Sequence, residues 1–311
     1  MSNLSHENAQ NLIDQIVNQV NSIILGKDTV IRLALNCILA SGHLLIEDLP
    51  GVGKTTLAHA LAQSLGMDFS RIQFTSDLLP ADILGVSVYE QTSHKFHFHK
   101  GPIFSNMILA DEINRATPKT QSALLEAMEE HQVSIEGETR QLPDPFFVIA
   151  TQNPTYQIGT FPLPESQLDR FLMKISLGYP DEAAERELLK GTSRRTMLTK
   201  LNSIVNPEQL KQLQESVSRI FVSDPLIEYI QTIVQQSRNS KEILLGLSPR
   251  AGLAILHAAR AWALMAGRDH VLPDDVQAVL TSVIAHRLKP VEDEHIDGTD
   301  LARQLLLTPV I

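Results

Sequence analysis

Cysteine is almost absent from this sequence. Cys37 is the only cysteine in 311 residues, which excludes an internal disulfide and a cysteine-rich zinc site. A chain without disulfides is typical of a reducing compartment, and we therefore expect a cytoplasmic protein.

Basic residues are also scarce. Lys and Arg number 26 against 36 Asp and Glu, which gives a formal net charge of −10. Proteins that coat nucleic acid usually carry a basic footprint, so the composition makes nucleic acid an unlikely partner without excluding a local basic patch.

Long hydrophobic runs are missing as well. The apolar runs are all interrupted; residues 33–46, for instance, contain Asn36, Ser41, Gly42 and His43, so we expect no membrane span. No Lys or Arg precedes Lys27, and a secretory signal peptide is not expected. The content of 43% hydrophobic and 20% charged residues is typical of a soluble globular protein with a large core.

The most informative segment that is present is residues 48–56, DLPGVGKTT. It follows an apolar run and precedes a helical pattern, which is the strand–turn–helix context of a phosphate-binding loop. Glycines allow the tight turn, and the unpaired N–H groups of the helix start favour an anion. Lys54 would reach the β- and γ-phosphates, and the Thr55 hydroxyl would bind Mg²⁺. The predicted nucleotide-binding residues of the loop are Asp48, Pro50, Gly51, Val52, Gly53, Lys54, Thr55 and Thr56.

One residue of the loop departs from the usual G-x-x-x-x-G-K-[ST] pattern. Asp48 stands where the first glycine is expected. Because Asp tolerates turn geometry better than most residues, we interpret the segment as a variant loop. A glycine-rich turn that binds nothing is the alternative.

Apolar segments alternate with helical patterns through the first 180 residues. Helices are expected near residues 12–24 and 28–40, and strands at 44–46, 69–74, 107–110, 146–150 and 171–177. Buried strands with helices between them predict an α/β fold with a mostly parallel sheet covered on both faces.

Two polar insertions and a helical second half complete the organisation. Hairpins are predicted at about 85–100 and 132–142. After Pro180, helical patterns dominate, at residues 182–190, 207–219, 225–236, 249–266 and 273–288. We therefore predict a nucleotide-binding αβα core over residues 1–180 and a smaller all-α domain over residues 181–311.

Two acidic residues end the third predicted strand. Asp111 and Glu112 follow the apolar residues 107–110, and strand ends at the carboxyl side of a parallel sheet open into the ligand crevice. We expect Asp111 to hold Mg²⁺, through water, and Glu112 to act as the general base for the attacking water. A solvated strand end is the alternative for an Asp–Glu pair taken alone.

Three further polar residues are candidates. Asn153 ends the next strand, where it could orient the attacking water or contact the γ-phosphate; taken alone, Asn-Pro is only a turn signal. Arg170 is either an arginine finger for a neighbouring chain's γ-phosphate or a partner in a local salt bridge with Glu165 or Asp169. Arg250 lies in the first turn of a helix, where a cation opposes the helix dipole unless an anion lies nearby. A nucleotide phosphate would supply that anion; an exposed Arg that covers apolar surface is the alternative.

Taken together, these residues resemble the MoxR family of AAA+ ATPases. The matching segments are IEDLPGVGKT (46–55), DEINRA (111–116), QSALLEAMEE (121–130), ATQNP (150–154), LPESQLDRF (163–171) and SPRA (248–251). The resemblance extends from about residue 24 to about residue 287, and Asp48 also looks usual for the family.

The resemblance implies a set of roles. Residues 51–56 resemble Walker A, and Asp111 with Glu112 resembles Walker B. Asn153 matches sensor 1, Arg170 the arginine finger and Arg250 sensor 2. Gly26 matches the segment that contacts adenine, and the two hairpins resemble the helix-2 insert and the pre-sensor-1 hairpin. The implied cofactors are ATP and Mg²⁺.

The resemblance also implies partners. Such proteins form hexameric rings with ATP sites between subunits, often work with von Willebrand factor A domain proteins, and act as chaperone-like motors in metal-cofactor insertion or complex assembly. A DNA helicase or translocase, the motor of a magnesium-chelatase-like complex and a nucleotide-gated binding module are the alternatives. The acidic tip Glu136-Gly137-Glu138 argues against the helicase. A helicase would bind DNA in a salt-sensitive manner.

Overall fold

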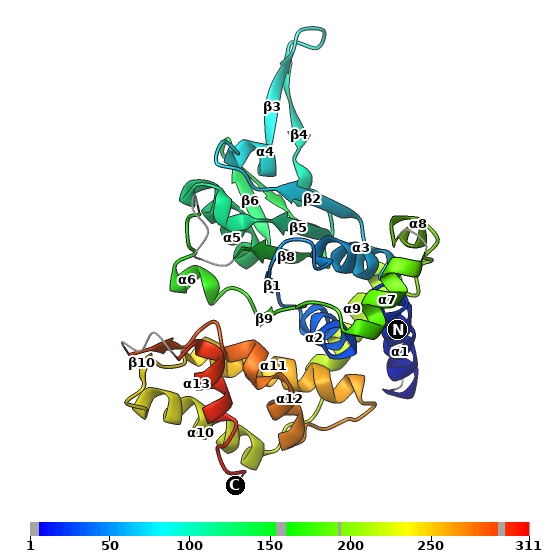
Figure 1. The fold of residues 1–311 in the computed structure, drawn as a ribbon. Helices are drawn as coiled ribbons and strands as arrows, with labels where there is room; N and C mark the ends of the chain where they lie inside the picture. The colour runs from blue at the N-terminus through cyan, green and yellow to red at the C-terminus, as the bar shows by residue number, and fades with distance from the viewer. Residues whose placement is uncertain (1–5, 154–159, 192–193, 292–295, 311) are drawn as a thin grey trace.

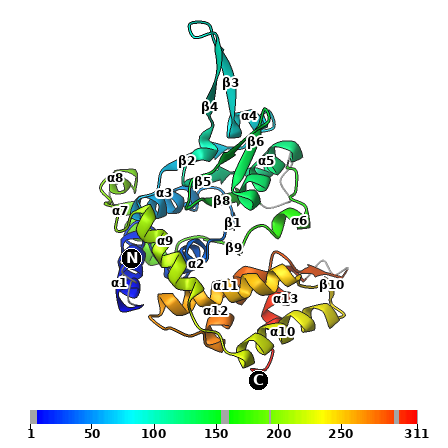
Figure 2. The same cartoon turned by 180° about the vertical axis from the view of Figure 1, so that it is seen from behind.

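The computed structural model describes residues 6–153, 160–191, 194–291 and 296–310. A sheet with helices on both faces forms the middle of the molecule, between a projecting hairpin and a layer of helices (Figure 1). Seen from behind, the same three levels remain distinct (Figure 2).

Five strands form the central sheet, in the order β2-β5-β8-β1-β9. All neighbouring pairs are parallel, as the alternating pattern predicted, so their carboxyl ends lie on one side, called here the carboxyl end of the sheet. The strands are β1 (Leu44–Glu47), β2 (Phe69–Gln73), β5 (Met107–Asp111), β8 (Phe147–Gln152) and β9 (Met173–Ile175).

The pleat of the strands separates two apolar cores. In β1, Leu44 and Ile46 pack into one core while Leu45 belongs to the other, because successive strand residues face opposite sides. The first core holds α1 (His6–Asn21), α2 (Asp28–Leu39) and α3 (Lys54–Ser64); the second holds α4 (Pro80–Leu84) and α5 (Pro118–Glu130).

The structure contains antiparallel hairpins at both predicted insertions. The first pairs β3 (Gly85–Glu90) with β4 (Lys95–Lys100), and the second pairs β6 (Gln132–Ile135) with β7 (Glu138–Gln141). The β3–β4 hairpin projects far from the sheet (Figure 1).

The helices after residue 180 occupy two places. Both views show α7 (Glu182–Lys190), α8 (Arg194–Leu198) and α9 (Pro207–Ser218) beside α1, α2 and α3. The layer farthest from the projecting hairpin holds α10 (Asp224–Asn239), α11 (Pro249–Met265), α12 (Pro273–Ile284) and α13 (Gly298–Leu305). The domain division at residue 180 stays a proposal, because part of the second half packs on the first.

Some elements differ from the sequence prediction. The helical half also contains a short antiparallel ribbon of β10 (Ile243–Leu245) and β11 (Lys289–Pro290). Strand β9 is shorter than residues 171–177 at both ends; beyond its carboxyl end, the N–H groups of Leu177 and Gly178 donate to the Asp48 carboxylate. The short helices α4, α6 (Glu165–Leu168), α8 and α13, and the 3-10 turns η1 (Pro102–Phe104) and η2 (Ile113–Arg115), were not predicted.

Among the described helices, none combines the length and the apolar character that a membrane span requires.

Candidate active site

The loop between β1 and α3 has the backbone geometry of an anion cradle. Gly51 and Gly53 have φ of 86° and 103°, values that L side chains rarely adopt. Gly53 is also the N-cap of α3, so no side chain caps the first-turn N–H groups. Open space surrounds the Cβ positions of both glycines, and free N–H donors at a helix start are what a phosphate group requires.

Lys54 is the first residue of α3 and lies folded over this loop. Its ammonium group donates to the carbonyl oxygens of Asp48, at 2.7 Å, and Leu49, at 3.0 Å. Burial lowers the pKa of Lys54, whereas the nearby carboxylates of Asp48, Asp111 and Glu112 raise it. Neutral carbonyls only solvate a cation, so the ammonium group remains available to a phosphate.

The Asp48 side chain has structural contacts of its own, and its predicted contact with a nucleotide stays a prediction. One oxygen of its buried carboxylate accepts hydrogen bonds from the Ser176 hydroxyl and from the N–H groups of Leu177 and Gly178. The carboxylate therefore fastens the end of β1 to the segment after β9. The hydrogen bond from Lys54 goes to the main-chain carbonyl of Asp48.

A cavity of about 310 Å³ lies beside the loop. Its walls combine Pro50, Val52 and Thr56 with the end of the α1 region and the segment around α7. Gly26, expected near adenine, shapes the turn before α2 with φ of 69°, and an added Cβ would approach Asp181 to 3.0 Å. Its neighbours Leu25 and Lys27 line the cavity, together with Ile23, Ile24, Gly51, Gly53, Tyr179, Pro180, Leu188 and Arg194.

Asp111 ends β5 at the carboxyl end of the sheet and has two partners. One carboxylate oxygen accepts the Thr151 hydroxyl at 2.6 Å. The other accepts the Arg71 guanidinium of β2, also at 2.6 Å. Arg71 was not singled out in the sequence, where nothing marks which cation of an edge strand will face an acid.

Glu112 is held in one orientation by three side chains. Its carboxylate accepts from Asn153 and Gln73, each at 3.0 Å, and pairs with Arg115 at 3.2 Å. Its backbone has φ of 57°, a left-handed conformation that costs roughly 1–2 kcal/mol for a side chain with a Cβ. The Thr151 hydroxyl accepts the Glu112 N–H at 2.8 Å, which stabilises that conformation.

These side chains fit a nucleotide with a magnesium ion. The free N–H groups and Lys54 supply positive potential for phosphates, while the exposed Thr55 offers a hydroxyl. Asp111 supplies the oxygen ligands that Mg²⁺ prefers. Among the described residues, no separate group of His, Cys, Asp and Glu could hold a metal ion.

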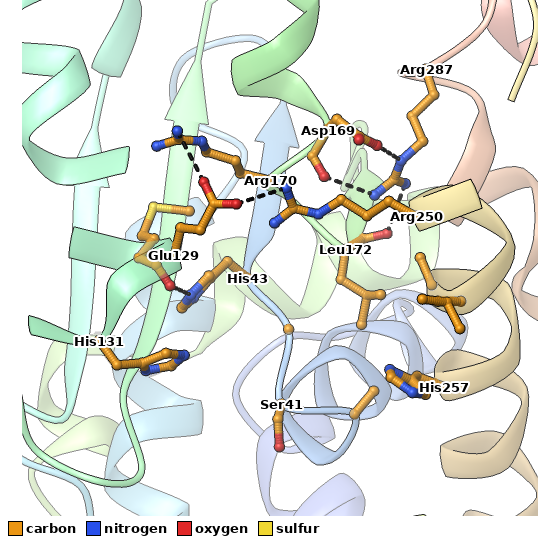
Figure 3. A pocket seen from close by; sticks show the side chains of 15 residues that line it. Ser41, His43, Glu129, His131, Asp169, Arg170, Leu172, Arg250, His257 and Arg287 are labelled. Atoms are coloured by element: carbon orange, nitrogen blue, oxygen red, sulfur yellow. Dashed lines mark hydrogen bonds and ion pairs between the residues drawn. The ribbon is translucent and has the colours of Figure 1, made fainter. Parts of the chain in front are cut away.

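Arg170 and Arg250 lie at the other end of the sheet. They line a cavity of about 290 Å³ together with Ser41 and His43, which precede β1 (Figure 3). The phosphate loop follows β1, and at about 3.3 Å per strand residue His43 and Asp48 are roughly 16 Å apart. No residue lines both cavities, so the structure does not bring these arginines to the loop of the same chain.

Both arginines bind the same acid. Arg170 contacts Glu129 at 2.9 Å and Arg250 contacts it at 3.0 Å. Within the chain, the anion beside Arg250 is Glu129, near the end of α5, and the nucleotide phosphate expected there stays a prediction. The local salt bridges suggested for Arg170 are absent among the described contacts, because Glu165 pairs with Lys289 and Asp169 pairs with Arg287.

Arg287 fastens the segment that carries Arg170 to the helical layer. Its guanidinium donates to the Asp169 carboxylate at 2.7 Å and to the carbonyls of Phe171 and Leu172. His286 also faces the Phe171 carbonyl, at 3.0 Å. Burial lowers the pKa of Arg287 and the Asp169 carboxylate opposes this effect, so the pair remains ionic.

Comparison with known proteins agrees with this geometry. Residues 43–173 match the family described as "ATPase family associated with various cellular activities (AAA)", and residues 235–305 match the AAA lid domain.

Similar proteins cover nearly the whole chain. YeaC of Bacillus subtilis, which is uncharacterised, is 47% identical over 94% of this chain and 91% of its own length. Chaperone MoxR1 of Mycobacterium tuberculosis is 41% identical over 96% of this chain and 81% of its own. The crystal structure of a candidate ATPase from Cytophaga hutchinsonii, 37% identical, superposes with a TM-score of 0.90 over 98% of this chain and 96% of its own.

Proposed function

The chain belongs to the MoxR family of AAA+ ATPases, and we propose that it hydrolyses ATP to ADP and phosphate in order to remodel or mature partner proteins. One observation carries the enzymatic part. Asp111 ends a strand of one parallel sheet, and the phosphate loop, Glu112 and Asn153 follow strands of the same sheet, so they lie at its carboxyl end.

The loop and Lys54 bind the substrate in this proposal. The N–H groups at the start of α3 donate to phosphate oxygens, and Lys54 exchanges its carbonyl partners for the β- and γ-phosphates. The cavity beside the loop takes the base. Thr55 and Asp111 hold Mg²⁺, which when bound neutralises charge on the phosphates.

Glu112 is the general base. Its carboxylate accepts the proton of the attacking water, and Asn153 holds the carboxylate from the end of β8. The left-handed backbone at Glu112 fits a functional position, since strained conformations persist where the surrounding structure holds them. Here that surrounding structure is Thr151, which contacts both acids.

A neighbouring chain completes the site. Arg170 and Arg250 lie together at the amino end of the sheet, where they cannot reach the loop of their own chain but are open to another. A planar cation stabilises charge that develops on the transferred phosphoryl group. We therefore propose a homo-oligomeric ring, a hexamer as in the family pattern, with both arginines acting in trans.

The proposed biological role is supported by a relative. A similar protein is a chaperone by name, which favours remodelling of protein partners, with a von Willebrand factor A domain protein as the expected companion. The second hairpin does not favour DNA as the substrate. Arg140, its one basic residue, pairs with Glu138 and lies over the Phe98 ring, 4.0 Å from its centroid.

Mixed assemblies test the shared site. Lys54→Ala damages the loop and Arg170→Ala damages the opposite face, so each variant alone should lose ATP turnover. Random mixing of equal amounts joins the two intact halves at about one interface in four, and turnover should recover to roughly that fraction.

The matched control mixes Lys54→Ala with Glu112→Gln. Both defects then lie on the loop side of the interface, no complete site forms, and turnover should stay near zero. A recovery in this control equal to that of the first mixture would contradict the division of the site between chains.

A further inference from the structure

Glu129 joins two parts of the chain that are far apart in sequence. Its Oε2 atom contacts Arg170, from the segment between α6 and β9, and its Oε1 atom contacts Arg250, from the start of α11. Figure 3 shows the carboxylate between the two guanidinium groups.

The charges lining this cavity do not balance. Three arginines face it, Arg170, Arg250 and Arg287, against two carboxylates, Glu129 and Asp169. Asp169 is taken by Arg287, so Glu129 alone neutralises two cations. The histidine His43 adds no charge at neutral pH, because burial lowers its pKa to about 4.

We propose that Glu129 is a displaceable counter-ion for the two arginines. It holds them while this face of the chain is free, and the phosphates of a nucleotide on the adjoining chain take its place when the face is occupied. This inference rests on the proposed function, since it assumes that the arginines complete a neighbour's site.

The exposure of the three side chains permits the exchange. Side-chain exposure is 35% for Glu129, 26% for Arg170 and 48% for Arg250, and ion pairs at such positions are weak. A phosphate chain carries more negative charge than one carboxylate and offers more oxygen atoms in the geometry that guanidinium groups prefer. The start of α11, beside Arg250, also favours an anion.

In this proposal, Glu129 acts mainly by competing with phosphate for the two arginines. The Arg170 side chain is 26% exposed, and the backbone carbonyls on either side of it, of Asp169 and Phe171, accept from Arg287, so it keeps its place without the carboxylate. Removing the negative charge therefore frees both cations for a phosphate more than it disorders them.

The first test measures anion binding without hydrolysis. In a Lys54→Ala background, which weakens the chain's own loop, Glu129→Gln should bind inorganic tripolyphosphate at least about threefold more tightly by calorimetry, as loss of an exposed ion pair allows. The added changes Arg170→Ala and Arg250→Ala should abolish the gain. Glu126→Gln, an exposed site on the same helix that does not line the cavity, is the matched control.

The second test measures assembly. In the otherwise unchanged chain, Glu129→Gln should lower the chain concentration that gives half-maximal ATP turnover per chain, whereas Glu126→Gln should not. A variant that merely loosened the fold would shift this concentration upward.

The outcomes separate the two proposals. Tripolyphosphate binding that is unchanged or weaker in Glu129→Gln overturns the counter-ion. Tighter binding with an unchanged concentration dependence overturns its role in assembly. If turnover in the mixture of Lys54→Ala and Arg170→Ala chains also fails to recover, the shared site is overturned. The competition between Glu129 and an anion for the arginines would still hold.

Discussion

Asn153 donates its side-chain amide to Oε1 of Glu112 at 3.0 Å, across the ends of β8 and β5. Glu112 is partly exposed and Asn153 is buried, so a buried side chain fixes the orientation of the carboxylate. A general base is effective only when its acceptor oxygen is held within hydrogen-bond reach of the proton it takes.

Glu112→Gln should separate nucleotide binding from hydrolysis. The amide keeps the shape of the side chain but cannot accept a proton, so turnover should fall by about 100-fold or more, while binding of a fluorescent ATP analogue stays similar. Phosphate release is the measurement and Glu126→Gln is the control. Turnover close to that of the unchanged chain would remove Glu112 as the base.

Arg71→Gln should change the magnesium requirement. Arg71 contacts the carboxylate of Asp111, which we expect to hold the metal, and a nearby cation opposes Mg²⁺ electrostatically. The free Mg²⁺ concentration for half-maximal turnover should drop by roughly 3–10-fold, the effect of about 1 kcal/mol for a partly exposed pair. Arg71→Lys, which keeps the charge, should stay near the original value; equal shifts in both variants would argue against competition for Asp111.

Asp48→Gly should destabilise the chain although it restores the usual loop pattern. The change leaves the Leu177 and Gly178 N–H groups without their carboxylate acceptor, and lost bonds to a charged group cost about 1.5–3 kcal/mol each at most. Urea unfolding should show a loss of roughly 2–4 kcal/mol. Stability equal to that of the unchanged chain would mean that Asp48 merely substitutes for glycine.

His43 should make stability depend on pH below 6.5. The Val148 N–H donates to Nδ1 and Nε2 faces the Met128 carbonyl, which fixes a neutral ring, and burial lowers its pKa from 6.5 to about 4. The unfolded chain therefore binds a proton that the folded chain refuses. Stability is full above pH 6.5 and falls as the pH drops toward 4, by up to about 3 kcal/mol from this residue.

Unfolding free energies across this pH range measure the effect. His43→Gln should flatten the slope by up to about 1.4 kcal/mol per pH unit, whereas His94→Gln, on the exposed first hairpin, is the control. An unchanged slope in His43→Gln would show that other groups cause the acid sensitivity.

Local patterns predicted the architecture well. Leu44 to Ile46 and residues 107–110 are apolar runs of strand length, and Ser248-Pro249 is a helix start that the structure confirms. Such signals depend on neighbours in the sequence, and those neighbours remain neighbours after folding.

Contacts between residues far apart in the chain could not be predicted from the sequence. Arg250 needed an anion, but many acids could serve, and only the packing of α11 near α5 selects Glu129. Similarly, Leu188 and Arg194 line the cavity beside the loop because α7 and α8 pack back on the first half. The contacts of the Asp48 carboxylate could not be predicted either, because its partners lie about 130 residues later.

Because the loop and the arginines lie at opposite ends of one sheet, the number of complete sites depends on how the chains are arranged. Two chains related by a two-fold axis cannot complete both of their sites at one contact, since each contact joins a loop face to an arginine face. An open row of chains always leaves one loop without arginines, and only a closed circle leaves none. ATP turnover per chain would therefore indicate whether the ring is closed. Removing a single chain from the ring removes two contacts and leaves one loop without arginines.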